Sequence, residues 1–389
     1  MELVRQPPPA PTVAGEVATF YSYKGGVGRT MALANVAALL TRRGIPVLMV
    51  DWDLDAPSLH YYFPGDGEHP GVLELFEACR EQLRSRHGAA PDAELANKVL
   101  DAVGWEQYVT RVDQAHPLYL MRAGRLDGHH AERASRLDWQ AMFDACPSLF
   151  RALAERMAAR FSHVLIDSRS GRADSAGICT ILLPTRLVLV FTPSRPQLDG
   201  LEALVARATT YRRSHEDEQR PLLVYPLPAR IDAGDPALRA LWRRGDIERR
   251  VPGYQPMFER ALAEAYGYTR MSLEGYFDRV QLQQCGGHVC GEPLPALEEE
   301  GDCFSLAHSY EAFLGWFQKG LCPWEALAET PLPVAAPLAQ DLGSVLFAPH
   351  ELNNHHKLLA EQERASYWQP RRGRGGPAGP RKADLAEPG

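Results

Sequence analysis

The sequence predicts a doubly wound, mainly parallel α/β sheet with helical additions and a disordered C-terminal tail. Two observations carry this prediction: strand-like and helix-like patterns alternate along the chain, and the strand-like runs are continuously apolar rather than alternating. Continuous apolar runs are typical of parallel strands that helices cover on both faces. With 389 residues, of which 45% are hydrophobic, the chain is long enough to bury a large core.

The first strand–helix–strand unit lies near the N-terminus. "VATFYS" at residues 17–22 is a short β-rich run, and "TMALANVAALLTRR" at residues 30–43 has apolar residues at helical spacing. Gly44 then provides a helix stop, and "PVLMVD" at residues 46–51 is a continuous apolar strand. These segments predict one βαβ unit.

The same alternation returns in the middle of the chain. Residues 152–167 pass from a helical pattern into the strand "HVLID", and residues 185–192 form another apolar strand. A helical pattern at residues 201–213 and a strand pattern at residues 221–227 follow. Strands separated by helices favour parallel pairing in a single doubly wound sheet.

Composition shifts divide the chain into three parts. Residues 1–16 are rich in proline and small residues and are expected to form a flexible arm. Residues 17–322 form the main domain, with a helical insertion at about 80–115 and a helical extension at about 230–320. Residues 323–389 are a Pro/Ala-rich segment and a low-complexity tail that cannot build a core.

Bulk properties restrict the function classes. No apolar run of about 18 residues and no secretory signal is visible, so we expect a cytoplasmic protein without a membrane span. Seven cysteines in a chain of this length fit reduced thiols better than a disulfide framework. The net charge of −7 gives no overall attraction to nucleic acid. Metal binding is not favoured for the group Cys285, His288, Cys290 and Cys303, because its spacing matches no common zinc pattern.

A glycine-rich turn joins the first strand to the first helix. In "FYSYKGGVGRTMALANVAALL", residues 20–40, the backbone N–H groups of Gly25, Gly26, Val27 and Gly28 can surround an anion at a helix N-terminus. The hydroxyl of Thr30 is then placed to bind Mg²⁺ between terminal phosphates. The motif therefore predicts a nucleotide site, and the alternative is a tight strand–helix turn that binds nothing.

"YKGGVGRT", followed by "LANVAALL" and "VLMVDWDLDAP", resembles the deviant Walker A ATPases of the ParA/MinD family, in particular the group with a KGGVGR loop. The resemblance covers about residues 17–280. It implies a P-loop NTPase fold, ATP as the nucleotide, and an ATP-dependent sandwich dimer in which Lys24 reaches the phosphates of the opposite subunit. It also implies the nucleotide-binding residues Gly25, Gly26, Val27, Gly28, Arg29, Thr30, Met31 and Gly171.

Two positions depart from the commoner family pattern GKGGVGKT. Tyr23 replaces the first glycine and Arg29 the second lysine. A guanidinium is longer and bulkier than an ammonium, so this exchange is not conservative at a tight phosphate site. We therefore expect nucleotide binding to survive better than turnover, with Lys24 and Arg29 as catalytic cations. A degenerate loop that binds no nucleotide is the alternative.

Carboxylates follow two of the predicted strands. By the resemblance, Asp51 lies near magnesium and Asp53 is the switch I residue that positions the attacking water; the alternative for Asp53 is a solvated acidic loop. Asp167, which ends the strand "HVLID", resembles the Walker B aspartate that holds magnesium through water. Gly171 then matches the switch II glycine. Arg169 contacts either phosphate or a neighbouring acid.

These residues predict an ATP-binding and slowly ATP-hydrolysing dimeric switch that regulates a protein partner. By analogy with other KGGVGR variants, the partner belongs to a bacterial regulatory or defence system. Alternatives are a nucleotide-binding scaffold without turnover, a ParA-like partitioning protein, a kinase relative, and an interaction protein that uses residues 230–320 without nucleotide. Nucleic acid is a less favoured partner, because the chain is acidic and shows no basic core patch.

Overall fold

The computed structural model describes residue 11 and residues 14–63, 69–85, 91–214, 222–284, 294–298 and 305–326. Its main sheet contains the strands β1 (Glu16–Tyr21), β2 (Val47–Asp51), β3 (Thr110–Asp113), β4 (Leu118–Met121), β5 (His163–Asp167), β6 (Arg186–Phe191) and β7 (Leu223–Pro228). These seven strands lie in the order β3-β4-β2-β5-β1-β6-β7. Every neighbouring pair is parallel except β3 with β4. The predicted doubly wound, mainly parallel sheet is confirmed.

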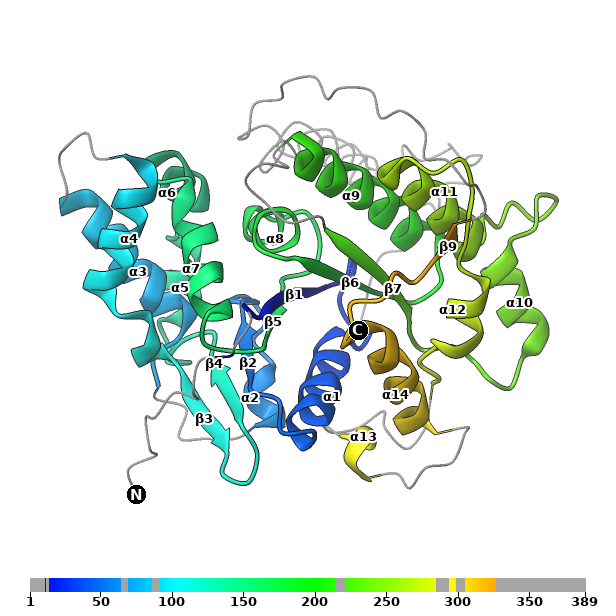
Figure 1. Cartoon of the computed structure of the whole chain (residues 1–389), viewed down its shortest axis with the longest axis horizontal. Helices are drawn as coiled ribbons and strands as arrows, with labels where there is room; N and C mark the ends of the chain where they lie inside the picture. Colours follow the sequence, from blue (N-terminus) through cyan, green and yellow to red (C-terminus); the bar gives the residue numbers. More distant parts are fainter. Residues whose placement is uncertain are drawn as a thin grey trace, which may run out of the picture. The chain divides into compact units, whose positions relative to one another are not determined.

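Helices cover both faces of the sheet (Figure 1). One face carries α1 (Arg29–Arg42), α13 (Pro295–Glu298) and α14 (Leu306–Phe317). The other carries α7 (Ser148–Ala158), α8 (Asp174–Gly177), the π-helix η2 (Ile178–Leu182), α9 (Arg195–Ser214) and α11 (Tyr254–Tyr266). Because neither face meets water, β2, β5 and β6 are buried along their whole length, as their apolar sequences require.

Further helices flank the two edges of the sheet. Those near β3 and β4 are α2 (Leu59–Tyr62), α3 (Val72–Ser85), α4 (Asp92–Val103), η1 (Trp105–Tyr108), α5 (His130–Ser135) and α6 (Trp139–Ala145). Aromatic rings join this group and α7 to the end of β2 through tilted, edge-on and stacked pairs among Trp52, Phe76, Trp139 and Phe150. At the β7 edge lie α10 (Pro236–Arg244) and α12 (Glu274–Arg279), with the short antiparallel pair β8 (Met271–Ser272) and β9 (Glu325–Ala326).

The topology places the glycine-rich loop at the centre of one sheet edge. β1 lies between β5 and β6, and the chain leaves β1 toward β2 on one side and later returns to β6 on the other. In open parallel sheets, ligands bind beyond the carboxyl ends of the strands at such a switch point. The loop between β1 and α1 therefore stands where a ligand site is expected.

The helical insertion expected at about 80–115 is wrong in part. Helix α3 begins earlier, at Val72, and residues 110–113 form strand β3 rather than helix. Strand β4, "LYLM", has only four residues, and its pairing with β2 through the register Val47↔Leu118 makes it part of the main sheet. So short an apolar run gives no clear periodicity, and its pairing depends on the tertiary structure.

The expected domain boundaries also need correction. Glu16 belongs to β1, and the N–H of Gly15 donates to the carbonyl of Ala158, so the last residues of the expected arm are part of the fold. At the other end, the fold continues past residue 322, because Glu325 and Ala326 pair with β8. The expected disordered tail lies outside the described residues. Among the helices that the structure describes, none has both the length and the apolar character needed to cross a membrane.

Candidate functional site

The loop after β1 is shaped by two glycines in the left-handed region. Gly26 has φ 75° and Gly28 has φ 90°, and residues with a Cβ rarely adopt these backbone angles. A methyl group at either position would meet no atom within 4 Å, so the backbone conformation, and not the space, requires glycine. Gly28 is the N-cap of α1, and no side chain caps the first N–H groups of that helix. These groups are therefore available to an anion.

Arg29 joins two carboxylates beneath this loop. Its Nε donates to Asp167 Oδ1, and its Nη2 donates to Asp53 Oδ2 at 2.9 Å. All three side chains are buried, with Arg29 8% exposed and Asp167 fully covered. The loop arginine is thus held by the two acids that were predicted to serve magnesium and water.

Thr30 lies beside the same aspartate. Its hydroxyl donates to Asp167 Oδ2 at 2.7 Å and is 3.0 Å from the hydroxyl of Ser58. Asp167 therefore has one oxygen on Arg29 and the other on Thr30. Since Thr30 stands in the first turn of α1 and Asp167 ends β5, the helix and the strand bring a hydroxyl and a carboxylate together, as the predicted magnesium site requires.

Asp51 faces Asp167 across neighbouring strands. The two residues are partners in the register of β2 with β5. Oδ2 of Asp51 accepts the backbone N–H groups of Ser58 and Leu59, each at 3.1 Å, at the start of α2. Oδ1 of Asp51 is buried and has no hydrogen-bond partner among the described residues. Such an orphaned oxygen is costly unless a cation or an ordered water binds it.

Three buried carboxylates and one guanidinium determine the protonation of the site. Burial lowers the pKa of Arg29, but Asp167 and Asp53 outweigh burial and hold this pKa above its ordinary value. Burial raises the pKa of Asp51 well above its usual range, and the negative charge of Asp167 adds to the effect. Burial also raises the pKa of Asp167, although Arg29 opposes it. The site is therefore short of positive charge.

These features fit Mg²⁺ with a nucleotide. Asp51 has an oxygen without a partner, Thr30 supplies a hydroxyl, and the left-handed glycines leave an open turn at a helix N-terminus. Within the described residues, no group of three or more His, Cys, Asp or Glu side chains gathers as a metal cage. Magnesium needs no such cage, because it keeps several waters and shares phosphate oxygens.

The other predicted site residues lie around this centre. Lys24 is exposed on the loop, and Met31 packs partly against the core. Gly171 has φ 80°, and its N–H donates to the carbonyl of Ser22 at 3.4 Å. That N–H is therefore engaged with the chain itself. Arg169 forms an ion pair with Asp55, which is the second of its two expected contacts.

Sequence reasoning missed two features of the site. The hydroxyl of Ser58 is hydrogen-bonded to that of Thr30, and the N–H of Ser58 donates to Asp51. The only sequence signal for Ser58 was its position directly after "DWDLDAP". Tyr23 packs where a Cβ on Gly200 would meet its ring, and Arg172 lies 5.7 Å from the centre of that ring. The glycine in α9 thus makes room for the tyrosine that replaces the family's first glycine. The cysteines and histidine of the group 285–303 lie outside the described residues.

Residues 18–272 match the family model described as the CobQ/CobB/MinD/ParA nucleotide binding domain. The chain belongs to this family. The match spans most of the chain and ends shortly after α11. Family membership brings a nucleotide-binding P-loop domain and confirms the predicted resemblance to the ParA/MinD family. The family name joins cell-division and partition proteins with biosynthetic enzymes, so membership alone does not determine the reaction.

Several solved structures are similar to the chain. The cell division ATPase MinD of Pyrococcus furiosus is 18% identical, with 77% of this chain and 99% of that chain covered and a TM-score of 0.43. A ParA family ATPase from Chlorobium tepidum is 19% identical, with coverage of 57% and 76% and a TM-score of 0.38. Cobyrinic acid a,c-diamide synthase from Mycobacterium smegmatis, with an ATP analogue and magnesium, is 17% identical, with coverage of 61% and 83% and a TM-score of 0.41. The search of curated proteins found no sequence that matches this chain. The family assignment rests on the sequence model.

Proposed function

We propose that this protein is an ATP-dependent switch that binds Mg·ATP in the loop from Lys24 to Thr30 and hydrolyses it slowly. The observation that carries this proposal is the meeting of Arg29, Thr30, Asp51, Asp53 and Asp167 at the carboxyl ends of β1, β2 and β5. Burying this many charged groups costs free energy of folding, and a loop that binds no ligand has no use for them.

The residues divide the work by their chemistry. Backbone N–H groups of the glycine turn bind phosphate, while Thr30, Asp51 and Asp167 hold magnesium directly or through water. Magnesium, when bound, neutralises charge on the terminal phosphates. Asp53 lies at the edge of this group, where it accepts from Arg29 and from the N–H of Ala56. We assign to Asp53 the orientation of the attacking water.

Arg29 must change partners in this scheme. With its guanidinium on Asp167 and Asp53, it supplies the positive charge that these carboxylates lack. With a divalent cation held at Asp167, that positive charge would come from the metal, and the guanidinium of Arg29 would be free to turn toward phosphate. Binding therefore exchanges one set of ion pairs for another, which is consistent with slow turnover.

The dimer and the protein partner also belong to this proposal. Lys24 is exposed on the loop, where a residue that contacts a second subunit has to be. Closure of two subunits over ATP changes the surface that is available to a partner protein, and hydrolysis returns the subunits to the state before closure.

A second candidate is a nucleotide-binding module without turnover. One observation favours it: the loop cation is tied to both Asp167 and Asp53, so the carboxylate that would orient water is already in use. Phosphate release separates the candidates. If Arg29→Lys turns over ATP while the wild type does not, the arginine is the element that blocks hydrolysis.

The first test of the proposal is magnesium-dependent ATP binding. A fluorescent ATP analogue should bind the wild type more tightly with Mg²⁺ than with a chelator, and Thr30→Ala should remove most of this difference because one oxygen ligand is lost. Thr30→Ser is the matched control, since it keeps the hydroxyl. Equal affinities with and without magnesium in the wild type would refute the proposed site.

A further inference from the structure

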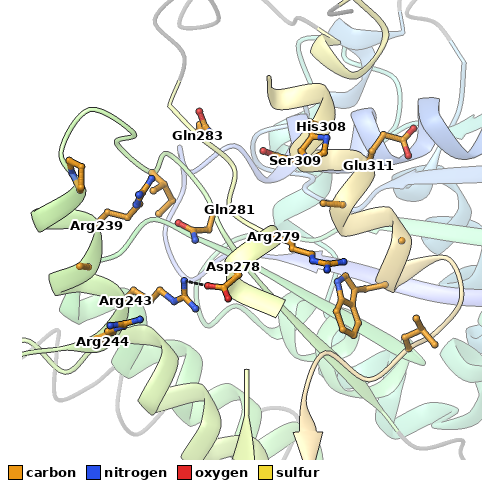
Figure 2. A pocket seen from close by; sticks show the side chains of 17 residues that line it. Arg239, Arg243, Arg244, Asp278, Arg279, Gln281, Gln283, His308, Ser309 and Glu311 are labelled. Carbon is orange, nitrogen blue, oxygen red and sulfur yellow. Dashed lines mark hydrogen bonds and ion pairs between the residues drawn. The ribbon is translucent and has the colours of Figure 1, made fainter. Parts of the chain in front are cut away.

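A second concave surface lies away from the nucleotide site. A cavity of about 1000 Å³ opens beyond the β7 edge of the sheet, between α10 on one side and α14 on the other. The end of α12 and the segment that follows it lie between these walls (Figure 2). No residue of the glycine loop lines this cavity. We call it the α10–α14 groove.

Arginines dominate the charge of the α10–α14 groove. Its lining includes Arg239, Arg243 and Arg244 from α10 and Arg279 from α12. Figure 2 shows Arg239 and Arg279 on either side of Asp278 and Gln281 in this view. Arg239 and Arg243 are one helical turn apart, so they share a face of α10.

The carboxylates of the lining are already neutralised. Asp278 accepts from Arg243 Nη1 at 2.7 Å, and Glu311 pairs with Arg43 of α1. Among the residues that the structure describes, the side chains of Arg239 and Arg279 make no hydrogen bond and no ion pair, and both residues are exposed. The groove therefore keeps positive charge that its own acids do not balance, in a chain whose net charge is −7.

The walls also offer apolar surface. Helix α10 buries none of its nine residues, and its Pro236 and Ala240 line the cavity. Across the groove, Leu321 is 45% exposed and Trp316 lines the cavity beside it. Because α10 has no fully buried residue, the face of this helix that lines the groove is accessible to a ligand.

We propose that the α10–α14 groove is a docking site for an acidic peptide segment of a partner protein. Carboxylates of that segment pair with Arg239 and Arg279, and an apolar side chain packs on Trp316 and Leu321. Guanidinium groups bind carboxylates through two parallel hydrogen bonds, and acidic motifs are commonly read by arginine clusters. Because the two arginines come from different helices, an extended segment with several acids fits them better than one small anion.

This proposal does not depend on ATP hydrolysis, because the groove shares no residue with the nucleotide site. The test selects a random library of short phage-displayed peptides on the full-length protein. Saturating Mg·ATP is present, so that the nucleotide occupies the anion-binding loop and acidic peptides cannot bind there. Enriched peptides are expected to contain more Asp and Glu than the starting library. No enrichment, or enrichment without an excess of acids, would overturn the proposal.

The site of binding is then tested with one enriched peptide carrying a fluorescent label. Its affinity should fall about tenfold or more in Arg239→Ala/Arg279→Ala, since two charge-assisted contacts are lost. Arg84→Ala/Arg270→Ala removes two exposed arginines elsewhere and should bind like the wild type. Equal binding by the groove variant contradicts the proposal. If a labelled DNA duplex, and not the peptide, loses affinity in the groove variant, the groove binds nucleic acid and the proposal fails.

Discussion

Arg29 of α1 and Asp167 of β5 form a buried ion pair through Nε and Oδ1, across a separation of 138 residues in the sequence. The same guanidinium donates to Asp53, so a single cation connects the phosphate loop to the ends of two strands. The single cation of the loop thus balances part of the negative charge of the site. Whatever replaces Arg29 in this role must bring positive charge.

We expect Arg29→Ala to destabilise the protein by about 3–5 kcal/mol in the presence of a chelator, because removing one member of a buried ion pair leaves charge without compensation. Excess Mg²⁺ should raise the stability of this variant more than that of the wild type, because Asp167 and Asp53 no longer have the guanidinium that balances their charge. Thermal unfolding with and without magnesium measures both effects.

Arg29→Lys is the matched control for that experiment. Lysine keeps the charge, but its single nitrogen cannot reach both Asp167 and Asp53 as the arginine does through Nε and Nη2. Its stability should lie between those of the wild type and Arg29→Ala. If all three proteins unfold alike in chelator, the ion pairs contribute nothing to folding.

Asp53→Ala should lower ATP turnover by about 100-fold or more while nucleotide affinity changes little, because orienting the water matters mainly in the transition state. Phosphate release and analogue binding measure the two quantities separately. Asp55→Ala is the control: Asp55 pairs with Arg169 at the surface, so its loss should leave turnover nearly unchanged. An Asp53→Ala protein with normal turnover would remove Asp53 from the mechanism.

Lys24→Ala should prevent ATP-dependent association. Lys24 is exposed, so its replacement should not disturb the core. Sedimentation in a non-hydrolysable ATP analogue is expected to show a dimer for the wild type and a monomer for the variant. Lys98→Ala removes another exposed lysine and should still form the dimer. A wild type that remains monomeric at tens of micromolar, well above a dimer affinity of about 1 μM, would contradict the sandwich arrangement.

His163 should make the fold sensitive to mild acid. Burial lowers the pKa of this histidine from 6.5 to about 4, and the charge of Arg186 adds to the shift. Above pH 6.5 the ring is neutral in both the folded and the unfolded chain. As the pH falls from 6.5 to 4, the unfolded chain takes up the proton first, so the free energy of unfolding should decrease by about 3 kcal/mol.

The measurement is denaturant unfolding at several pH values for the wild type and His163→Phe. The variant lacks the titrating group and should lose about 3 kcal/mol less stability over that interval. His129→Gln changes an exposed histidine and should follow the wild-type curve. Parallel curves for the wild type and His163→Phe would show that His163 titrates normally.

The sequence by itself determined the local units of the site. A short β-rich run predicted β1, apolar runs predicted β2, β5, β6 and β7, and a glycine turn between a strand and a helix predicted an anion site. The resemblance of these stretches to the ParA/MinD ATPases assigned Thr30, Asp51 and Asp167 to one magnesium site. That assignment agrees with the rule that parallel strands bring their carboxyl ends to one edge of a sheet.

Only the tertiary structure decided which of these groups bind one another. Nothing local to Arg29 indicates that its guanidinium turns to Asp167, and nothing local to β4 indicates that it pairs with β2. The α10–α14 groove likewise combines arginines from helices separated in sequence, which no periodic pattern records. Ion pairs, strand neighbours and surface grooves depend on long-range packing, in which every buried charge must find a partner that the fold happens to bring close.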